Sequence, residues 1–276
     1  MKRLLQIEWL KLRHYRPFWI LVGLYGLLSV LIISSVRPFL AFLSAKGANY
    51  EGIDLTIIPF YDFPDVWQNI TYIATFLKVF LAFIIIISVN NEITNKTLRQ
   101  GIIDGMSKKD WLQSKLLLIG SLSLGATVLL FLTGLITGLL YSHPHGYSEI
   151  FVNTEFLLTY ALEVFTYATF ALLITLIVRR TGLVMVGLLM YTFAFEPFIY
   201  VLLTFPPNEF DFPEWTKSLP PFFPVRALNN LIHVPFQKYA LQEYQDYVSI
   251  KETLIVIGWL IFNVGCSYWI LRRRDL

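Results

Sequence analysis

The chain has 276 residues, of which 56% are hydrophobic and 15% charged, and its mean hydropathy is +0.60. This composition is typical of proteins that cross a membrane several times, since a soluble fold would need several helices that are apolar on every face. The net charge of +3 is small, and we expect no nucleic-acid partner. The single cysteine, Cys266, lies in an apolar run, which excludes disulfides and cysteine metal cages.

The first segment, residues 1–17, is too basic to cross a membrane. Leu5, Trp9 and Leu12 share one helical face at this spacing, which gives a moderately amphipathic pattern. We predict a helix that lies on the inner leaflet, with its basic side chains near the anionic headgroups of membrane lipids. Glu8 and the absence of a small-residue cleavage site argue against a signal peptide.

Six apolar runs follow, each long enough to cross the roughly 30 Å hydrocarbon core, which takes about 20 helical residues. We predict one all-α transmembrane domain with six spans, over about residues 18–36, 70–89, 116–141, 155–178, 183–205 and 253–271. The first span should end near Arg37 and Pro38. Lys and Arg outnumber acids in the segments on one side of these spans, and acids are in excess on the other. We therefore expect a multi-pass protein of the inner (plasma) membrane, with residues 90–115 and both termini in the cytoplasm.

The longest segment between spans, residues 206–250, is assigned to the outer side. It is rich in proline and aromatic residues. One long helix is excluded here, because each interior proline removes a hydrogen bond and clashes with the preceding turn. We expect short interfacial or re-entrant helices before the last span, over residues 225–234 and 236–248.

The polar segment between the second and third spans, residues 90–115, carries a short helical pattern. Its apolar residues recur at helical spacing after Asn95, a candidate N-cap, and the pattern stops at Asp104 and Gly105. These apolar residues are Leu98, Ile102 and Ile103. We predict a short amphipathic helix over residues 95–104, suited to docking into a groove of a soluble partner. The alternative is a solvated loop with one incidental turn.

Two further local patterns concern the third span. Ser107 and Asp110 are spaced as a capping box that opens the helix leading into it. Within the span, Gly134 and Gly138 form a small-xxx-small pattern, which permits close packing of helices.

Three ionisable side chains lie inside predicted spans: Lys78 in the second, Glu163 in the fourth and Glu196 in the fifth. Each costs on the order of 3 kcal/mol at the bilayer centre, so these side chains should face the bundle interior or one another. Two interpretations stay open. Either the three residues contact a substrate or a gate, or Lys78 pairs with one of the glutamates and fixes the packing.

Catalytic motifs are sparse. The sequence has no G-x-x-x-x-G-K-[ST] phosphate loop, no H-E-x-x-H zinc motif and no G-x-S-x-G elbow. We therefore expect no catalytic residue and no enzyme activity in this chain. His143 and His145 are two imidazoles on an outer loop without a third placed ligand, so we also expect no metal site. Two alternatives are an intramembrane enzyme that uses Glu163, Glu196 and a loop histidine, and a non-transporting membrane scaffold or immunity protein.

The polar segment also carries the pattern of a known family. It contains E-x-x-x-x-T-L-R-x-G, then a turn of small, polar and basic residues, and then a lysine that opens the third span. These residues are Glu92, Thr97, Leu98, Arg99 and Gly101, followed by Ser107, Lys108, Lys109 and Lys115. The pattern resembles the segment between the second and third spans of ABC-2 type transporter permeases. It departs from that family at Lys96 and Ser114, where glycines are usual, and in its turn, which lacks proline.

The resemblance implies the membrane subunit of an ATP-driven exporter. A separate nucleotide-binding subunit would bind ATP and Mg²⁺ and would dock on the helix over residues 95–104. The coupling residues so implied are Glu92, Thr97, Leu98, Arg99, Ile102 and Ile103. An electrostatic latch from Glu92 to Arg99 or to a basic residue of the partner is expected. A second permease copy, identical or related, would complete the translocation pathway, and residues 206–250 would close it toward the outside.

Overall fold

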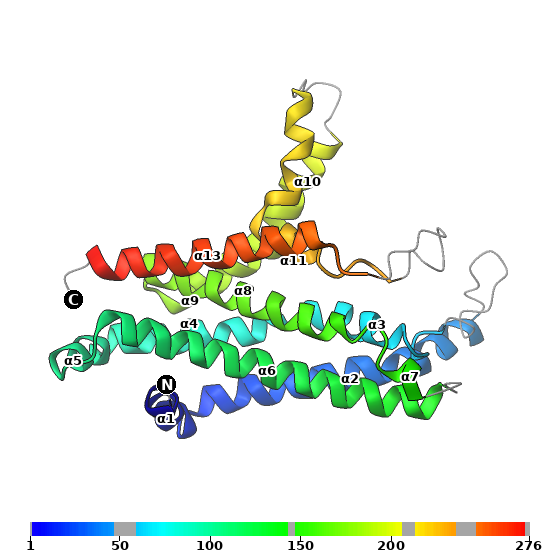
Figure 1. Ribbon diagram of the computed structural model, residues 1–276, viewed down its shortest axis with the longest axis horizontal. Coiled ribbons are helices and arrows are strands. Elements are labelled where there is room, and N and C mark those ends of the chain that lie inside the picture. The colour runs from blue at the N-terminus through cyan, green and yellow to red at the C-terminus, as the bar shows by residue number, and fades with distance from the viewer. Residues whose placement is uncertain (1, 47–58, 143–146, 206–212, 236–246, 274–276) are drawn as a thin grey trace.

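The computed structural model describes residues 2–46, 59–142, 147–205, 213–235 and 247–273, which are helical and contain no strand (Figure 1). In chain order the elements are α1 (Lys2–Arg13), α2 (Arg16–Ala45), α3 (Val66–Thr75), α4 (Lys78–Thr94), α5 (Thr97–Ile103), α6 (Lys108–Tyr141), α7 (Tyr147–Ile150), α8 (Glu155–Val178), α9 (Thr181–Met190), the π-helix η2 (Tyr191–Phe195), α10 (Glu196–Thr204), the 3₁₀ helices η3 (Glu214–Ser218) and η4 (Pro220–Phe222), α11 (Pro224–Asn229) and α13 (Ile250–Arg273). The described residues hold five helices long and apolar enough to cross a membrane, or six if α3 and α4 form one bent span. The expected fold class, an all-α protein with several membrane spans, is confirmed.

The long helices lie side by side along one axis (Figure 1). Among them α8 packs against α4, α6 and α13, and its buried side chains include Tyr160, Leu172 and Leu176. The elements α1 and α5 and the last turn of α13 lie toward one end of the bundle, which we call the α5 end. At the opposite end lies α7, and α10 and η3 stand out from the side of the bundle.

The predicted second span, residues 70–89, is broken in the structure. Helices α3 and α4 meet at an angle of 44° across Phe76 and Leu77. The amides of these two residues donate to carbonyls three positions back, which tightens the end of α3 into a 3₁₀ turn. The single hydroxyl proton of Thr75 is shared between the Thr71 carbonyl, at 3.2 Å, and Glu163, at 3.0 Å, and back-bonding to the helix carbonyl bends helices. The apolar pattern continues through the break, so it carried no signal of the bend.

The first predicted span was expected to end near Arg37 and Pro38, but the helix that contains it does not end there. Helix α2 contains both residues and continues to Ala45. A proline frees one carbonyl of the preceding turn, and in membrane helices neighbouring groups satisfy such freed carbonyls. The carbonyl that Pro38 leaves without its helical donor is that of Ser34, and Tyr61 donates its hydroxyl to the carbonyl of the residue before it, Ile33.

The remaining helices differ from the predicted spans mainly in their ends. Helix α8 covers the same residues as the predicted fourth span. The fifth span continues through the π-helix η2 into α10, and α11 is shorter than the helix expected over residues 225–234. The capping box is confirmed, because Ser107 Oγ accepts from the Asp110 amide at 3.0 Å, and α6 therefore begins at Lys108. The helix expected over residues 236–248 lies almost entirely outside the described residues.

The two glycines of the small-xxx-small pattern lie where α6 passes closest to α3 and the segment before it. A methyl group on Gly138 would overlap the Phe63 ring, and one on Gly134 would overlap Ile70. We expect Gly138→Ala to destabilise the protein by about 1 to 3 kcal/mol, because the ring has to move out of a packed site. The measurement is thermal unfolding in detergent, with Gly125→Ala as control, since no atom lies within 4 Å of a methyl group there. Equal unfolding temperatures for the two variants would contradict this.

Candidate functional site

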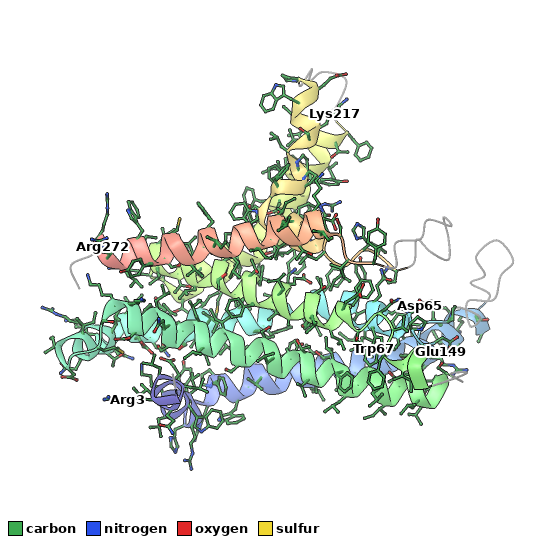
Figure 2. All side chains as sticks on the ribbon, in the orientation of Figure 1. Arg3, Asp65, Trp67, Glu149, Lys217 and Arg272 are labelled. Carbon is green, nitrogen blue, oxygen red and sulfur yellow. The ribbon has the colours of Figure 1, made fainter. Side chains whose placement is uncertain are left out.

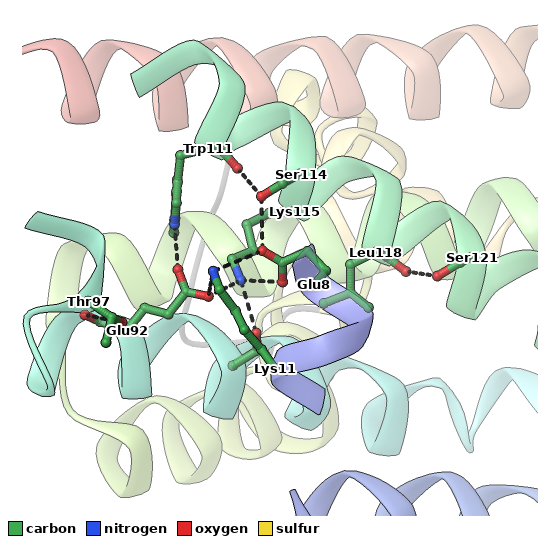
Figure 3. Close-up of polar contacts among 10 residues, drawn as sticks. Glu8, Lys11, Glu92, Thr97, Trp111, Ser114, Lys115, Leu118 and Ser121 are labelled. Atoms are coloured by element: carbon green, nitrogen blue, oxygen red, sulfur yellow. Dashed lines mark hydrogen bonds and ion pairs between the residues drawn. The ribbon is translucent and has the colours of Figure 1, made fainter. Parts of the chain in front are cut away.

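Four charged side chains from three helices meet at the α5 end of the bundle (Figure 3). Glu8 and Lys11 come from α1, Glu92 from the last turn of α4 and Lys115 from α6. The Lys115 ammonium lies 2.7 Å from Glu8 Oε2 and 2.6 Å from Glu92 Oε1. The Lys11 ammonium lies 2.9 Å from Glu92 Oε1 and 3.4 Å from Glu8 Oε1. We call these four residues the ion cluster, in which two acids balance two bases.

The ion cluster is buried except at Lys11. The side chains of Glu8 and Lys115 are 1% and 0% exposed, and Glu92 is buried as well. Charges this far from water are stable only when they are paired and hydrogen-bonded. Each charge of the cluster therefore depends on the others, and the cluster ties α1, α4 and α6 to one another.

Uncharged side chains complete this network. The bonds run from Trp111 Nε1 to Glu92 Oε2 (2.6 Å), from Ser114 Oγ to Glu8 Oε1 (3.0 Å) and from Lys115 Nζ to Ser88 Oγ (3.1 Å). The sequence spacing explains the convergence, because residues three or four apart share one face of a helix. Ser88 and Glu92 are so spaced on α4, Trp111 and Lys115 on α6, and Glu8 and Lys11 on α1.

Lys11 is the half-exposed member of the ion cluster. Burial lowers the pKa of its ammonium group, but the carboxylates of Glu92 and Glu8 together outweigh that effect, so the pKa of Lys11 is raised above its ordinary value. The ammonium group therefore stays charged across the physiological pH range. Lys11 keeps the charge of the cluster balanced where the cluster reaches solvent.

Helix α5 follows the ion cluster directly. Asn95 closes α4, and Lys96 adopts a left-handed conformation, with φ of 58°, as the residue before α5. The expected N-cap at Asn95 is therefore wrong, and the helix covers Thr97–Ile103, because the left-handed turn at Lys96 separates it from α4. Thr97 Oγ1 donates to the backbone carbonyl of Glu92 at 3.4 Å, which connects the start of α5 to the residue at the centre of the cluster.

The predicted coupling residues of α5 lie on two faces. Leu98 is 3% exposed and Ile102 is half-buried, so both belong to the inner face. Thr97, Arg99 and Ile103 are exposed, with Ile103 at 69%. Leu98 is thus an anchor of α5 on the core, and the exposed residues form the face of α5 that a partner could contact.

Glu92 is buried in the last turn of α4, just before α5. Its ion pairs among the described residues are with Lys11 and Lys115, and the expected latch to Arg99 is not among them. The sequence did not predict a role for Glu8 or Lys11 in this site. The one indication in the sequence was Glu8 itself, the single acid in an otherwise basic first helix. It did not identify the partner, because Lys115 is 107 residues away.

In the middle of the bundle the structure brings together two of the three ionisable residues expected inside spans. The Lys78 ammonium lies 2.5 Å from Glu163 Oε1, and both side chains are buried. Thr75 Oγ1 donates to Glu163 Oε2 at 3.0 Å, and Lys78 also donates to Asn229 Oδ1 of α11 at 3.0 Å. Of the two interpretations left open, the pairing of Lys78 with a glutamate is the one that the geometry matches.

Glu196, the third of these residues, binds backbone. Its buried carboxylate accepts from the amide of Val225 at 3.1 Å and from the amide of Arg226, at the start of α11. Both buried glutamates are thus engaged by neighbouring groups. Among the residues that the structure describes, no three His, Cys, Asp or Glu side chains gather into a metal-binding group, and His143 and His145 lie outside those residues.

Comparison with known proteins places the chain in a family. A family model described as "ABC-2 family transporter protein" matches residues 3–276. No curated protein matches the chain. The matched range includes all four residues of the ion cluster as well as α5 and α11. The chain therefore belongs to the ABC-2 family of transporter proteins.

Proposed function

We propose that this chain is the membrane-spanning permease subunit of an ATP-driven exporter and that α5 docks on a separate ATPase subunit. ATP and Mg²⁺ bind to that subunit, and two permease copies form the translocation pathway between them. Membership of the ABC-2 family supports a permease role in general. The observation that carries the coupling role is the position of α5, an exposed helix joined by one turn to a buried ion cluster.

The ion cluster connects α5 mechanically to three helices of the bundle. A force applied to the outer face of α5 passes to α4 through the short turn at Asn95 and Lys96. It then reaches α1 and α6 through Glu92, because Glu92 binds Lys11 and Lys115. Closure of the ATPase subunits on ATP would thus displace three helices together. Coupling of this kind needs an element with two arrangements that both sites bias, and the packing of one bundle against its partner copy supplies it.

The charge distribution supports an orientation with the α5 end in the cytoplasm. Figure 2 shows Arg3 and Arg272 toward the α5 end and Asp65 and Glu149 toward the opposite end. Basic residues near short loops stay on the cytoplasmic side of a membrane. Both termini would then be cytoplasmic and the membrane would be the inner (plasma) membrane, with α1 on its inner leaflet.

The two alternative functions gain no support from the geometry. An intramembrane enzyme would need a carboxylate available for chemistry, whereas Glu163 is paired with Lys78 and Glu196 binds the backbone of α11. A membrane scaffold without transport is not favoured either, because the chain belongs to a family of transporter proteins. The permease is therefore the function that we propose.

Changing Ile103 to aspartate should strongly weaken docking while leaving the fold intact. Ile103 is exposed on the outer face of α5, and a charge at an apolar contact removes a central part of a binding surface. We expect recovery of the ATPase subunit with this chain, purified from native membranes in mild detergent, to fall about tenfold or more. Mass spectrometry identifies the recovered subunit, and hydrolysis of ATP by the preparation gives a second measure.

The matched control is Ile250→Asp, which changes an isoleucine that is 79% exposed, against 69% for Ile103, at the start of α13 and far from α5. Its recovery of the ATPase should equal that of the unchanged protein. Leu98→Asp would test folding instead of docking, since Leu98 is buried. Recovery of the chain without any ATPase, or equal recovery with Ile103→Asp and Ile250→Asp, would refute the coupling role.

A further inference from the structure

Helix α11 is a short element, buried on one side and exposed at Asn229, that other helices hold in place. It has six residues, and a helix of that length is not stable by itself. Its apolar side chains Val225, Ala227 and Leu228 are buried among the spans. Trp259 of α13 donates from Nε1 to the Phe222 carbonyl just before α11, at 2.9 Å. The position of α11 therefore depends on bonds made by neighbouring helices.

The N-terminal end of α11 is held by Glu196. The first amides of a helix have no partner within the helix, so they need an acceptor from elsewhere when they are buried. The Glu196 carboxylate supplies it for the amides of Val225 and Arg226. Arg226 in turn lies over the ring of Tyr200 on α10, 3.9 Å from its centroid. These contacts join α11 to the fifth span.

The C-terminal end of α11 is held by Lys78. The Lys78 ammonium donates to the Asn229 side chain at 3.0 Å while it pairs with Glu163 of α8. Glu163 also accepts from Thr75, the last residue of α3. One network thus joins α3, α4, α8 and α11 inside the bundle.

This network lies at the 44° break in the second span. Thr75 ends α3 and Lys78 begins α4, on either side of Phe76 and Leu77. A change of the bend angle moves Lys78 relative to Glu163, Thr75 and α11. The far end of α4 carries Glu92 of the ion cluster and leads into α5. A single helix therefore connects the proposed docking site with the contact to α11.

We propose that Lys78 and Asn229 form a latch that holds the C-terminal end of α11 in the bundle, and that movement of α4 opens it. The proposal rests on the proposed function, in which α4 is displaced through α5. In the latched state α11 is fixed at both ends, by Glu196 and by Lys78. When the bend between α3 and α4 changes, Lys78 withdraws from Asn229 and frees the C-terminal end of α11, while the N-terminal end stays bound to Glu196.

The experiment measures how fast a cysteine on α11 reacts with a membrane-impermeant maleimide added outside sealed vesicles that contain the full-length protein. Cys266 is first changed to alanine, and Ala227, which is buried in the latched state, is changed to cysteine. Asn229→Leu removes the acceptor of the latch and leaves the pair of Lys78 with Glu163 in place. We expect it to raise the rate of labelling at position 227 at least tenfold. Asn230→Leu, the same change one residue later, should leave the rate unchanged.

A second variant removes the donor of the latch. Lys78→Met combined with Glu163→Leu takes away both charges of the pair and leaves no buried charge unpaired, so it should also label rapidly. Ala171→Cys, at a buried position on α8, serves as a reporter of general unfolding and should stay unlabelled in every variant. Slow labelling of position 227 in both variants, or equal labelling at positions 171 and 227, would overturn the latch.

Two further measurements separate the latch from the proposed function. With the ATPase subunit bound, ATP and Mg²⁺ should raise labelling of the latched protein to the rate of Asn229→Leu. No response to ATP in a complex that hydrolyses it would overturn control of the latch by α4. Slow labelling in both variants from membranes that still yield the ATPase would overturn the latch alone, whereas failure of the unchanged chain to recover any ATPase would overturn the proposed function.

Discussion

Lys115→Met is expected to destabilise the protein by about 3 to 5 kcal/mol, the size of effect seen when one partner of a buried ion pair is removed. Lys115 is fully buried and lies between the carboxylates of Glu8 and Glu92. Without its ammonium group, Lys11 alone faces two carboxylates, and the ion cluster holds an excess negative charge away from water. The loss is large because desolvation of a carboxylate that has no compensating partner is so unfavourable.

Thermal unfolding of the purified protein in detergent, followed by tryptophan fluorescence, measures this effect. Lys109→Met removes an exposed lysine from the same helix and is the matched control. Combining Lys115→Met with Glu92→Gln removes one charge of each sign and should recover part of the loss, since Glu8 then pairs with Lys11. If Lys115→Met and Lys109→Met unfold at the same temperature, the ion cluster is not a structural junction.

The second large effect concerns the pair in the middle of the bundle. Lys78→Met and Glu163→Leu, made separately, should each destabilise the protein by about 3 to 5 kcal/mol, because each leaves the other charge buried and unpaired. The two changes together should destabilise it far less, since apolar side chains of similar volume commonly replace a buried pair without loss. The coupling energy between the two sites is then large and favourable to the pair.

A double-mutant cycle on unfolding in detergent measures this coupling. The design needs only the four proteins and no knowledge of the transported substrate. Additive effects of the two substitutions would show that Lys78 and Glu163 act independently, contrary to their 2.5 Å separation. Lys251→Met, a change of an exposed lysine at the start of α13, gives the baseline for loss of a basic side chain.

The two buried networks have different consequences for a transporter. The ion cluster joins α1, α4 and α6 through several bonds per charge, so these helices should move as one body. The pair of Lys78 with Glu163 lies beside a bend, and its bond to α11 is a single hydrogen bond to an amide side chain. A displacement that leaves the first network intact can therefore break the weaker contact of the second.

Much of the fold is predictable from local properties of the sequence. The length of an apolar run decides whether a helix can cross a membrane, which is why the bounds of α8 agree with the predicted span. The capping box depends on two residues three positions apart, so Ser107 and Asp110 identify the start of α6 without knowledge of other helices. The short helix after Glu92 follows from the same kind of local pattern.

Partner choice could not be read from the sequence. We expected Glu92 to pair with Arg99, which is seven residues away in the sequence. In the structure Lys11 binds it instead, from 81 residues away. The energy of an ion pair depends on the distance and burial of its two charges, and both are set by how helices pack. For the same reason the inward position of Leu98 depends on how α5 packs on the core, and the contact of Lys78 with Asn229 depends on where α11 enters the bundle.

The sequence by itself thus determined that this is an all-α membrane protein, where its long apolar runs lie, and that a polar segment with a short helix separates two of them. The length of an apolar run and the capping of a helix depend only on residues close together in the sequence, so they can be recognised without knowledge of the fold. Only the tertiary structure decided which charges meet, where the second span breaks and what holds α11. Those features depend on groups brought within a few ångströms by the packing of helices distant in sequence, and only the packed bundle defines that proximity.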